Sequence, residues 1–333
     1  MDIVKVTLLK IYLCLHFSSG ENSIVLSTDG NTTIIYRTIK HAIDYVPKHN
    51  PISEDHISTI KKFFKDNRQV LVLTGAGVST ESGIPDYRSE GVGLFARSGT
   101  KPVQYQEFLK YPKIRQRYWA RNFVGWPNFS SIAPNQNHAI LKHLEDRQQV
   151  QRIITQNVDN LHSKAGSRQV IELHGTAFKV VCLSCDYITS RFAFQKVLSD
   201  INQEIIAAPQ AVRPDGDIDL PQEFVEDFKT PACPKCGGVL KPDIVFFGDN
   251  VPKSRVDAIN DEVDKCDALL VLGSSLSTYS GYRIILRVKE LHKQVGIVNI
   301  GPTRADHLVD FKINAKCSEV LQHCKQQNSE TGG

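Results

Sequence analysis

Four short apolar runs are spaced along the chain, and each of them ends in or is followed by small or polar residues. They occupy residues 69–74, 152–155, 268–272 and 295–299 (QVLVLT, RIIT, ALLVL and VGIVN). Continuous apolar runs of this length are typical of strands that are buried on both faces of a parallel sheet. In such sheets ligands bind beyond the carboxyl ends of the strands. The sequence therefore predicts an α/β fold, a doubly wound parallel Rossmann-like sheet with one ligand crevice.

Two Cys-x-x-Cys pairs, Cys182/Cys185 and Cys233/Cys236, indicate a metal site. Each pair places two thiolates on one turn, which is half of the tetrahedral shell that Zn²⁺ prefers. Two disulfides or four ordinary thiols are the alternatives, but eight cysteines are few for a disulfide scaffold of this length. The connection between the pairs, residues 186–232, is unusually long. Residues 176–239 are therefore predicted to form a smaller inserted zinc-binding module.

The length of 333 residues suffices for one large and one small domain, and 41% apolar with 23% charged residues is ordinary for a globular protein. The large Rossmann-like domain is assigned to residues 51–175 and 240–324, and residues 325–333 to a tail. Residues 1–50 are predicted to be a poorly ordered leader or targeting segment. A secretory signal, an organelle transit segment and a leader without function remain open for it.

The loop after the first run, GAGVSTESGIPDYR, begins with Gly75 and Gly77, part of a dinucleotide-binding fingerprint. Glycine lets the backbone approach a pyrophosphate, and a helix N-terminus supplies free N–H donors. A tight turn without a ligand is the alternative. The nearby polar triplet 86–88 (DYR) favours a ligand, because such residues in a Gly/Pro-containing loop have little structural purpose.

Polar residues also follow the second run and the segment 170–175 (VIELHG). Asp159 can accept hydrogen bonds from an amide or a ribose, or it can cap a helix. His174 can take up a proton near neutral pH, so it is a candidate general base. A structural histidine and a zinc ligand are its alternatives, although four cysteines already complete a structural zinc shell.

The motifs GAGVSTESGIPDYR, TQNVDNLHSKAG, ELHG, the two cysteine pairs, KPDIVFFGD and GSSLSTYSGYR, in this order, resemble the sirtuins over about residues 52–322. Segments such as IRQRYWARNFVGWPNFSS and VNIGPTR are similar to the class II mitochondrial branch of that family. The resemblance implies a Rossmann-type domain, a zinc module with one structural Zn²⁺, and NAD as a consumed co-substrate.

The resemblance also implies roles for the residues at the matching positions. His174 matches the catalytic general base, and Gln156, Asn157 and Asp159 match the pocket that receives nicotinamide. The implied NAD contacts are Gly75, Ala76, Gly77, Thr80, Asp86, Tyr87, Arg88, Phe95, Gln156, Asn157, Val158, Asp159, Gly273, Ser274, Ser275, Asn299, Ile300, Gly301 and Cys317. Cys182, Cys185, Cys233 and Cys236 match the zinc ligands. Val245, Phe246, Phe247 and Gly248 match a segment that binds an extended substrate peptide by main-chain pairing.

The implied activity is NAD-dependent deacylation of protein lysine, which yields free lysine, nicotinamide and O-acyl-ADP-ribose. The segment 94–97 (LFAR) keeps an arginine but lacks the tyrosine of the desuccinylase branch, so lipoyl or methylglutaryl groups are expected in preference to acetyl. The expected partners are acyl-lysine proteins, in particular metabolic enzymes of the mitochondrial matrix, and neither nucleic acid nor a membrane.

Three other functions are weighed against deacylation. A protein mono-ADP-ribosyltransferase would use the same NAD pocket, and a non-catalytic NAD-sensing scaffold would not need the polar triad of Asn157, Asp159 and His174. A nucleic-acid-binding zinc ribbon would need basic and aromatic residues beside the cysteine pairs. The chain instead has an acidic stretch in the connection between the pairs, at 209–219, a net charge of only +4 and no run of five Lys or Arg residues.

Overall fold

The computed structural model describes residues 23–27, 33–37, 45–97, 102–203, 213–218, 220 and 222–324. The chain separates into two units, Met1–Ile43 and Asp44–Gly333. In the first unit, β1 (Ser23–Ser27) pairs with β2 (Thr33–Arg37) in antiparallel fashion. The rest of the predicted leader up to residue 44, and the predicted tail 325–333, lie outside the described residues. In the described ranges, every helix is too short or too polar to cross a bilayer.

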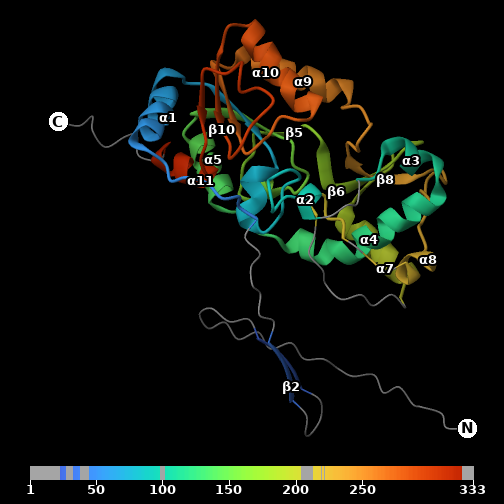
Figure 1. Ribbon diagram of the computed structural model, residues 1–333. Helices are drawn as coiled ribbons and strands as arrows, with labels where there is room; N and C mark the ends of the chain where they lie inside the picture. The colour runs from blue at the N-terminus through green and yellow to red at the C-terminus, as the bar shows by residue number, and fades with distance from the viewer. Residues whose placement is uncertain are drawn as a thin grey trace, which may run out of the picture. The chain divides into compact units, whose positions relative to one another are not determined.

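The second unit contains a six-stranded parallel sheet, which confirms the predicted fold class (Figure 1). Its strand order is β11 (Phe311–Ile313), β10 (Gln294–Val298), β9 (Ala268–Leu272), β3 (Val70–Thr74), β4 (Val150–Thr155) and β5 (Val170–Glu172). The chain enters at β3, moves outward to β5 and returns to β9 on the other side of β3. The order therefore reverses between β3 and β9, which is the switch point at which doubly wound sheets bind ligands.

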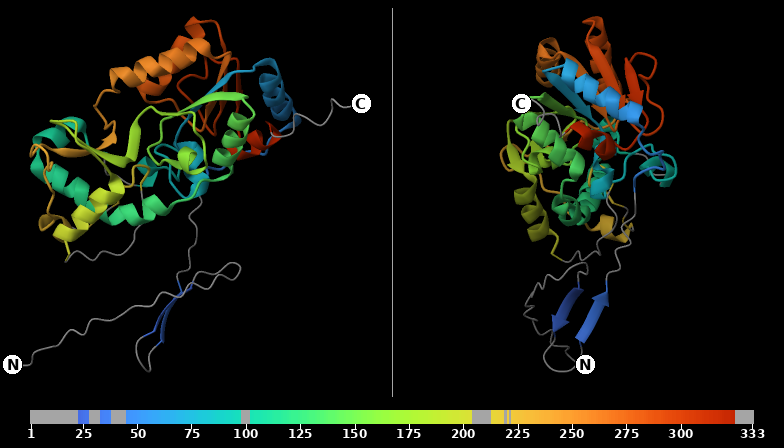
Figure 2. Two further views of the ribbon diagram at one scale, coloured as in Figure 1. Left: turned by 180° about the vertical axis from the view of Figure 1, so that it is seen from behind. Right: turned by 90° about the vertical axis from the view of Figure 1, so that its left-hand side faces the viewer.

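Alternate residues of the central strands pack against helices on opposite faces of the sheet. Val70 and Val72 join the core under α1 (Glu54–Asp66), α5 (Gln136–Asp146) and α11 (Cys317–Leu321). Leu71 and Leu73 join the core under α9 (Lys253–Lys265) and α10 (Tyr279–Glu290). Figure 2 shows these layers from two further directions. Both faces are covered, so the strands are apolar throughout rather than alternating.

A smaller lobe is built on the antiparallel sheet β7 (Ile188–Ser190), β6 (Gly175–Cys182) and β8 (Leu240–Ile244). Its core also contains Phe108, Trp119 and Phe194, which come from α3 (Tyr105–Lys110), α4 (Pro112–Ser131) and α7 (Arg191–Ile201). The lobe thus includes α3 and α4, whereas the sequence predicted that residues 51–175 belong to the large domain. The short elements are η1 (Ala76–Ser82), α2 (Leu94–Arg97), α6 (Leu161–Lys164), α8 (Glu223–Glu226) and η2 (Gln322–Cys324).

Candidate functional site

A cavity of about 1680 Å³ lies at the carboxyl ends of β3, β4 and β9 and is lined by residues of both lobes. Most of the residues singled out in the sequence line it, namely Gly75, Ala76, Gly77, Asp86, Tyr87, Arg88, Gln156, Asn157, Val158, Asp159, His174, Val245, Phe246, Phe247, Gly248, Gly273, Ser274, Ser275, Asn299, Ile300 and Gly301. Thr80 and Cys317 line a small adjoining pocket instead. Phe95 lines neither, although its ring centroid is 5.8 Å from that of Tyr87.

The glycines after β3 are required by the close approach of two loops. The N–H of Gly75 donates to the carbonyl of Leu272 at 3.0 Å, and that of Gly77 to Gly273 at 2.9 Å. A Cβ on Gly75 would lie only 2.7 Å from the carbonyl oxygen of Gly273, whose own φ is +57°. Glycine is therefore needed here even without a ligand, and the tight packing leaves the backbone of both loops at the cavity wall.

Asp86 shapes the loop in which it lies. One of its carboxylate oxygens accepts hydrogen bonds from the backbone N–H groups of Arg88 and Ser89, at 2.9 and 2.7 Å. This is an Asx-type turn, in which a short acidic side chain replaces backbone partners. The guanidinium of Arg88 lies 5.4 Å above the ring of Phe95. Burial raises the pKa of Tyr87 well above its usual value, so its hydroxyl remains a neutral donor at the cavity wall.

The loop after β4 is fastened to η1 by two polar side chains. The amide of Asn157 donates to the carbonyl of Gly75 and to the hydroxyl of Ser79, both at 3.1 Å. Asp159 accepts from the hydroxyl of Ser79 at 2.7 Å and from the N–H of Leu161 at 2.9 Å. The bond from Leu161 closes an Asx turn just before α6, but the N-cap of that helix is Asn160 and not Asp159. Asp159 also lines the cavity. Burial raises its pKa.

His174 follows β5 with a defined tautomer. Its Nδ1 is 2.9 Å from the carbonyl oxygen of Gln156, which can only accept, so Nδ1 carries the proton. Its Nε2 is thus an acceptor, and it lies 2.7 Å from Oγ of Ser280. Burial lowers the pKa of His174 to about 4, and the positive charge of Arg255 acts in the same direction. The imidazole is neutral at pH 7 and offers a basic nitrogen at the cavity.

The far end of the cavity is made by the loops after β9 and β10. The amide of Gln156 donates to Oγ of Ser274 at 2.8 Å, which joins the loops after β4 and β9. The side chain of Asn299 donates to the carbonyl of Ile300 at 2.9 Å. Cys317 is buried next to the carbonyl of Val298, and burial raises the pKa of its thiol to about 12. That thiol is therefore a packing group and not a nucleophile.

Several lining residues were not identified in the sequence. Residues 46–50, which were grouped with the leader, line the cavity, and His49 lies 3.3 Å from Glu319 of α11. Asn314 lines it too and accepts a hydrogen bond from the N–H of Gly301 at 2.9 Å. Ser280 lines the cavity as well, although its position in the motif GSSLSTYSGYR does not indicate this. These contacts join residues that lie far apart in the sequence, and no local sequence pattern predicts such pairs.

The segment after β8 lies across from the histidine. The N–H of Val245 donates to the carbonyl of His174 at 2.8 Å, and the carbonyl of Phe247 accepts from the N–H of Tyr105 at 2.9 Å. Extended backbone of this kind, at the edge of a cavity, is suited to pairing with a peptide strand.

One end of the cavity is mainly apolar and is lined by Ile84, Val103, Tyr118, Val158 and Phe246, with Pro214 and Asp215 from the connection between the cysteine pairs. That connection is fixed to α4 by a buried ion pair, Arg121 with Asp217 at 3.0 Å. A Cβ on Gly125 would lie 2.4 Å from the carbonyl of Gly216, so α4 and the connection touch along their backbones. Pro214 and Asp215 of the connection are thus part of the cavity wall.

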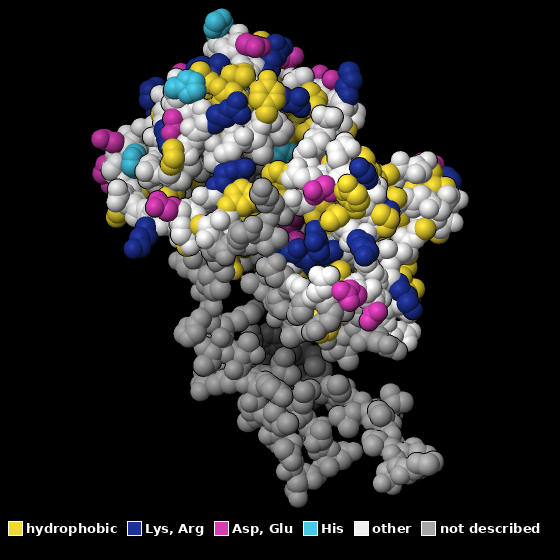
Figure 3. Space-filling model, turned by 45° about the vertical axis from the view of Figure 1, so that its right-hand side comes forward, with side chains coloured by type: hydrophobic (Ala, Val, Ile, Leu, Met, Phe, Trp, Pro, Cys, Tyr) yellow, Lys and Arg dark blue, Asp and Glu magenta, His cyan; other side chains and the backbone are white. Residues whose placement is uncertain are grey.

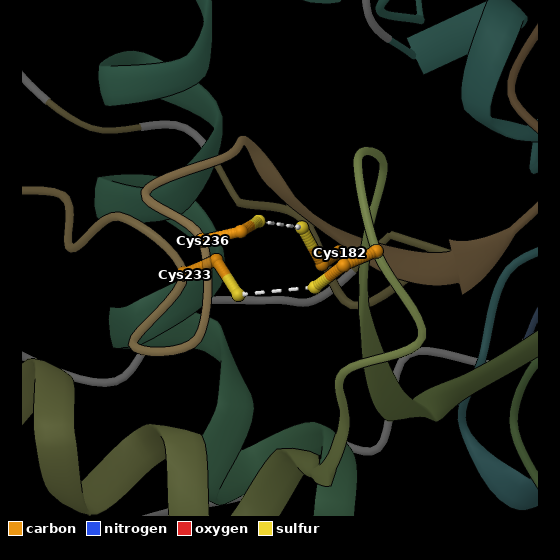
Figure 4. A group of neighbouring side chains, drawn as sticks. Cys182, Cys233 and Cys236 are labelled. Carbon is orange, nitrogen blue, oxygen red and sulfur yellow. Dashed lines mark hydrogen bonds between the residues drawn. The ribbon is translucent and has the colours of Figure 1, made fainter.

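The four cysteines of the two pairs form one cluster (Figure 4). Their sulfur atoms all lie within 4.8 Å of one another, with 3.5 Å between Cys182 and Cys236 and 3.7 Å between Cys185 and Cys233. A disulfide needs about 2.05 Å, whereas four thiolates about 2.3 Å from one Zn²⁺ lie about 3.8 Å apart. The cluster fits one tetrahedral zinc ion. None of the four lines the cavity, which suits a structural role.

The surface seen in Figure 3 carries mixed charge. Lys and Arg side chains are interspersed there with Asp, Glu and hydrophobic side chains. This face differs from the continuous basic surfaces that follow a phosphate backbone.

The Sir2 family model matches residues 75–280. The chain is 57% identical to the NAD-dependent protein deacylase Sirt4 of Drosophila melanogaster, over 84% of this chain and 89% of that protein. It is 48% identical to the human mitochondrial NAD-dependent protein lipoamidase sirtuin-4, over 83% of this chain and 88% of that protein. Among solved structures, one of a Sir2 enzyme is similar with a TM-score of 0.62 and 31% identity, covering 81% of this chain and 96% of that one. Another, of Sir2 with a p53 peptide and NAD⁺, has a TM-score of 0.61 and 27% identity, covering 80% and 95%.

Proposed function

Because the chain belongs to the Sir2 family, we propose that it is an NAD-dependent deacylase of protein lysine residues, as its similar relatives are named. The single observation that carries this proposal is the neutral His174, whose Nε2 is an acceptor at the wall of a cavity formed by Gly- and Ser-containing strand ends. The same cavity would serve mono-ADP-ribosyl transfer, but the names of the relatives favour deacylation.

We place the co-substrate NAD along the strand ends. The loops that begin at Gly75 and Gly273 would face its phosphates, and Asn299 to Gly301 its adenosine. Asn157 and Asp159 would hold the carboxamide of nicotinamide. The carboxylate of Asp159 would accept a hydrogen bond from that group, and the amide of Asn157 would donate one. Both side chains are already hydrogen-bonded to the hydroxyl of Ser79. A pocket held in this way needs little reorganisation when the bond to nicotinamide breaks.

His174 would act after nicotinamide has left. By then the acyl oxygen would have replaced nicotinamide on C1′ of the ribose. Nε2 would accept a proton from a neighbouring ribose hydroxyl, whose oxygen then attacks the acyl carbon. Addition of water to that carbon and cleavage of its bond to the lysine nitrogen would give free lysine and O-acyl-ADP-ribose. The carbonyl of Gln156 would stabilise the imidazolium through Nδ1, as it already holds the neutral ring. Proton transfer by a positioned base contributes about 10²–10⁴-fold to a rate.

The substrate peptide would lie between residues 245–248 and the segment that begins at Ser275. Main-chain pairing on both sides would bind many sequences alike, so selectivity depends on the acyl group. The apolar wall near Ile84, Val158 and Phe246 suits a long uncharged chain.

The charges beside this wall favour a lipoyl group over a methylglutaryl group. Arg121 and Arg213 both contact Asp217, and Asp215 lies at the cavity beside them. Both arginines are engaged with Asp217, so neither offers an unpaired positive charge to an acyl carboxylate. Burial already raises the pKa of Asp215, and a second carboxylate nearby would add like-charge repulsion.

A comparison of kcat/KM for acetyl, lipoyl and methylglutaryl peptides tests this proposal. We expect lipoyl to be the best substrate, and Asp215→Asn to raise the value for methylglutaryl relative to lipoyl. A clear preference for acetyl would contradict the proposed acyl selectivity. Incorporation of labelled adenylate into protein without an acyl substrate would favour the transferase instead.

The proposed location is the mitochondrial matrix, with acylated metabolic enzymes as substrates. Two relatives of similar length are named mitochondrial. Imaging of the full chain with a C-terminal fluorescent tag would test the location, and a cytosolic signal would contradict it.

A further inference from the structure

Ser280 makes a hydrogen bond with the reactive nitrogen of His174, and the family motifs did not indicate a role for it. Its Oγ lies 2.7 Å from Nε2 of His174, and the residue lines the cavity. Because Nδ1 of the ring is protonated, Nε2 must accept here and the serine hydroxyl must donate. The hydroxyl therefore donates a hydrogen bond to the same lone pair of Nε2 that the proposed reaction uses.

This contact is not explained by helix capping. Ser280 is the second residue of α10, and the N-cap of that helix, Thr278, makes no side-chain cap bond. The hydroxyl of Thr278 instead donates to the side-chain oxygen of Gln156 at 3.2 Å. The start of α10 is thus directed toward the loop that carries the backbone partner of His174.

The backbone of α10 also approaches this loop closely. A Cβ on Gly281 would lie 2.8 Å from the side-chain oxygen of Gln156, so glycine permits the approach. Three contacts, from Thr278, Ser280 and Gly281, therefore join the start of α10 to Gln156 and His174. The imidazole is held from both ends, by a carbonyl at Nδ1 and by a hydroxyl at Nε2.

We propose that Ser280 is a positioning residue for the general base, an inference that rests on the proposed deacylase function. In the free enzyme its hydroxyl keeps Nε2 directed into the cavity. A ribose hydroxyl that approaches Nε2 takes over this hydrogen bond, because the nitrogen has a single lone pair. Once Nε2 has taken the proton from that hydroxyl, Oγ of Ser280 accepts from the new N–H, so the proton is held on His174 until the leaving lysine nitrogen takes it up and the base is restored.

The proposal predicts that Ser280→Ala slows the steps after nicotinamide release and spares the step before it. Formation of O-acyl-ADP-ribose should fall about tenfold, the effect of one lost hydrogen bond to a reacting group. Exchange of labelled nicotinamide into NAD, which requires the acyl peptide but not the base, should stay within about twofold of wild type. Ser280→Thr, which keeps the hydroxyl, should restore product formation to within about threefold. Ser254→Ala, an exposed serine of α9, is the matched control.

Two results would overturn the proposal. Unchanged product formation in Ser280→Ala would show that the hydroxyl does not assist the base. An equal fall of exchange and product formation would assign Ser280 to cofactor or peptide binding.

The ¹⁵N NMR resonance of His174 Nε2 provides a measurement that does not depend on the reaction. It should move in Ser280→Ala and return in Ser280→Thr, and an unmoved resonance would contradict the hydrogen bond. If wild type releases no nicotinamide from NAD and acyl peptide, the proposed function fails. The resonance still tests the contact in that case.

Discussion

The two ring nitrogens of His174 differ in their hydrogen bonding, and the proposed chemistry of the site depends on this difference. Nδ1 is fixed by a backbone carbonyl and Nε2 is left as the acceptor. His174→Ala should therefore lower deacylation by about 10²-fold or more, while NAD binding is retained. Steady-state kinetics and calorimetry with NAD would measure the two effects.

His307→Ala, at an exposed loop position, is the control for that substitution. More than about a tenth of wild-type activity in His174→Ala would show that another group is the base.

The pH dependence follows from the lowered pKa of His174. Only the unprotonated ring can accept a proton, and its pKa in the folded protein is about 4, below the ordinary value of 6.5. The fraction of active base therefore stays near its maximum from pH 7.5 down to about pH 5.5. We expect kcat/KM to show no acid limb with an apparent pKa near 6.5. An acid limb at that pH, lost in His174→Ala, would contradict the assigned environment.

At this scale the sequence predicted which residues line the cavity better than it predicted their contacts. Residue type and order in the sequence pointed to Asn157, Asp159 and His174, and all three line one cavity. The sequence could not predict that Asp86 closes an Asx turn, or that Ser280 faces His174, because hydrogen-bond partners depend on side-chain directions in three dimensions. Their catalytic and binding roles remain proposals.

Among the elements, the junction of β5 and β6 lies close against the backbone of β8. Gly175 follows the histidine with φ of +78°, and a Cβ there would lie 1.9 Å from the carbonyl oxygen of Asp243 in β8. Gly175→Ala should therefore lower the free energy of unfolding by about 3 kcal/mol or more. It should also lower activity, because the histidine is adjacent.

Gly166→Ala is a matched control for this clash. Gly166 also has a positive φ, of +95°, but the nearest atom to an added Cβ is the flexible side-chain end of Lys142 at 3.3 Å. Its cost should be about 1–2 kcal/mol, the price of the left-handed backbone alone. Equal losses for the two variants in urea denaturation would show that the backbone contact with β8 does not matter.

The long strands could be predicted from the sequence because burial on both faces leaves a continuous apolar run. The three-residue strand β11 (Phe311–Ile313) is too short to leave one. The role of α4 was also missed. Its buried residues include Tyr118, Trp119, Ala120, Arg121 and Asn122 in succession, so no single apolar stripe marks the face that packs on the small lobe.

At the scale of the whole molecule, the cysteine cluster is predicted to hold the small lobe together. The purified protein should contain one zinc ion per chain, and Cys236→Ser should lower both the zinc content and the Tm, the latter by about 5 °C or more. Metal analysis and thermal unfolding would measure this. Cys266→Ser, at a buried cysteine outside the cluster, should keep its zinc. Full zinc content in Cys236→Ser would contradict the assignment.

The two lobes meet at the cavity, and this meeting could be predicted only in part. The switch point of the sheet follows from the order of the apolar runs, since doubly wound sheets bind ligands there. The packing of Pro214 and Asp215 into the wall depends on the buried pair of Arg121 and Asp217. These side chains lie far apart in the sequence, and nothing local indicates that they meet.

The most direct measurement of the central claim is the fate of oxygen atoms during turnover. With NAD, an acyl-lysine peptide and ¹⁸O-water, we expect nicotinamide, free lysine and O-acyl-ADP-ribose in equal amounts, with one ¹⁸O in each transferred acyl group. This pattern requires that the acyl oxygen is given to the ribose and replaced from water. Release of a free acid without consumption of NAD, or of ADP-ribose with the acyl-lysine intact, would contradict the account.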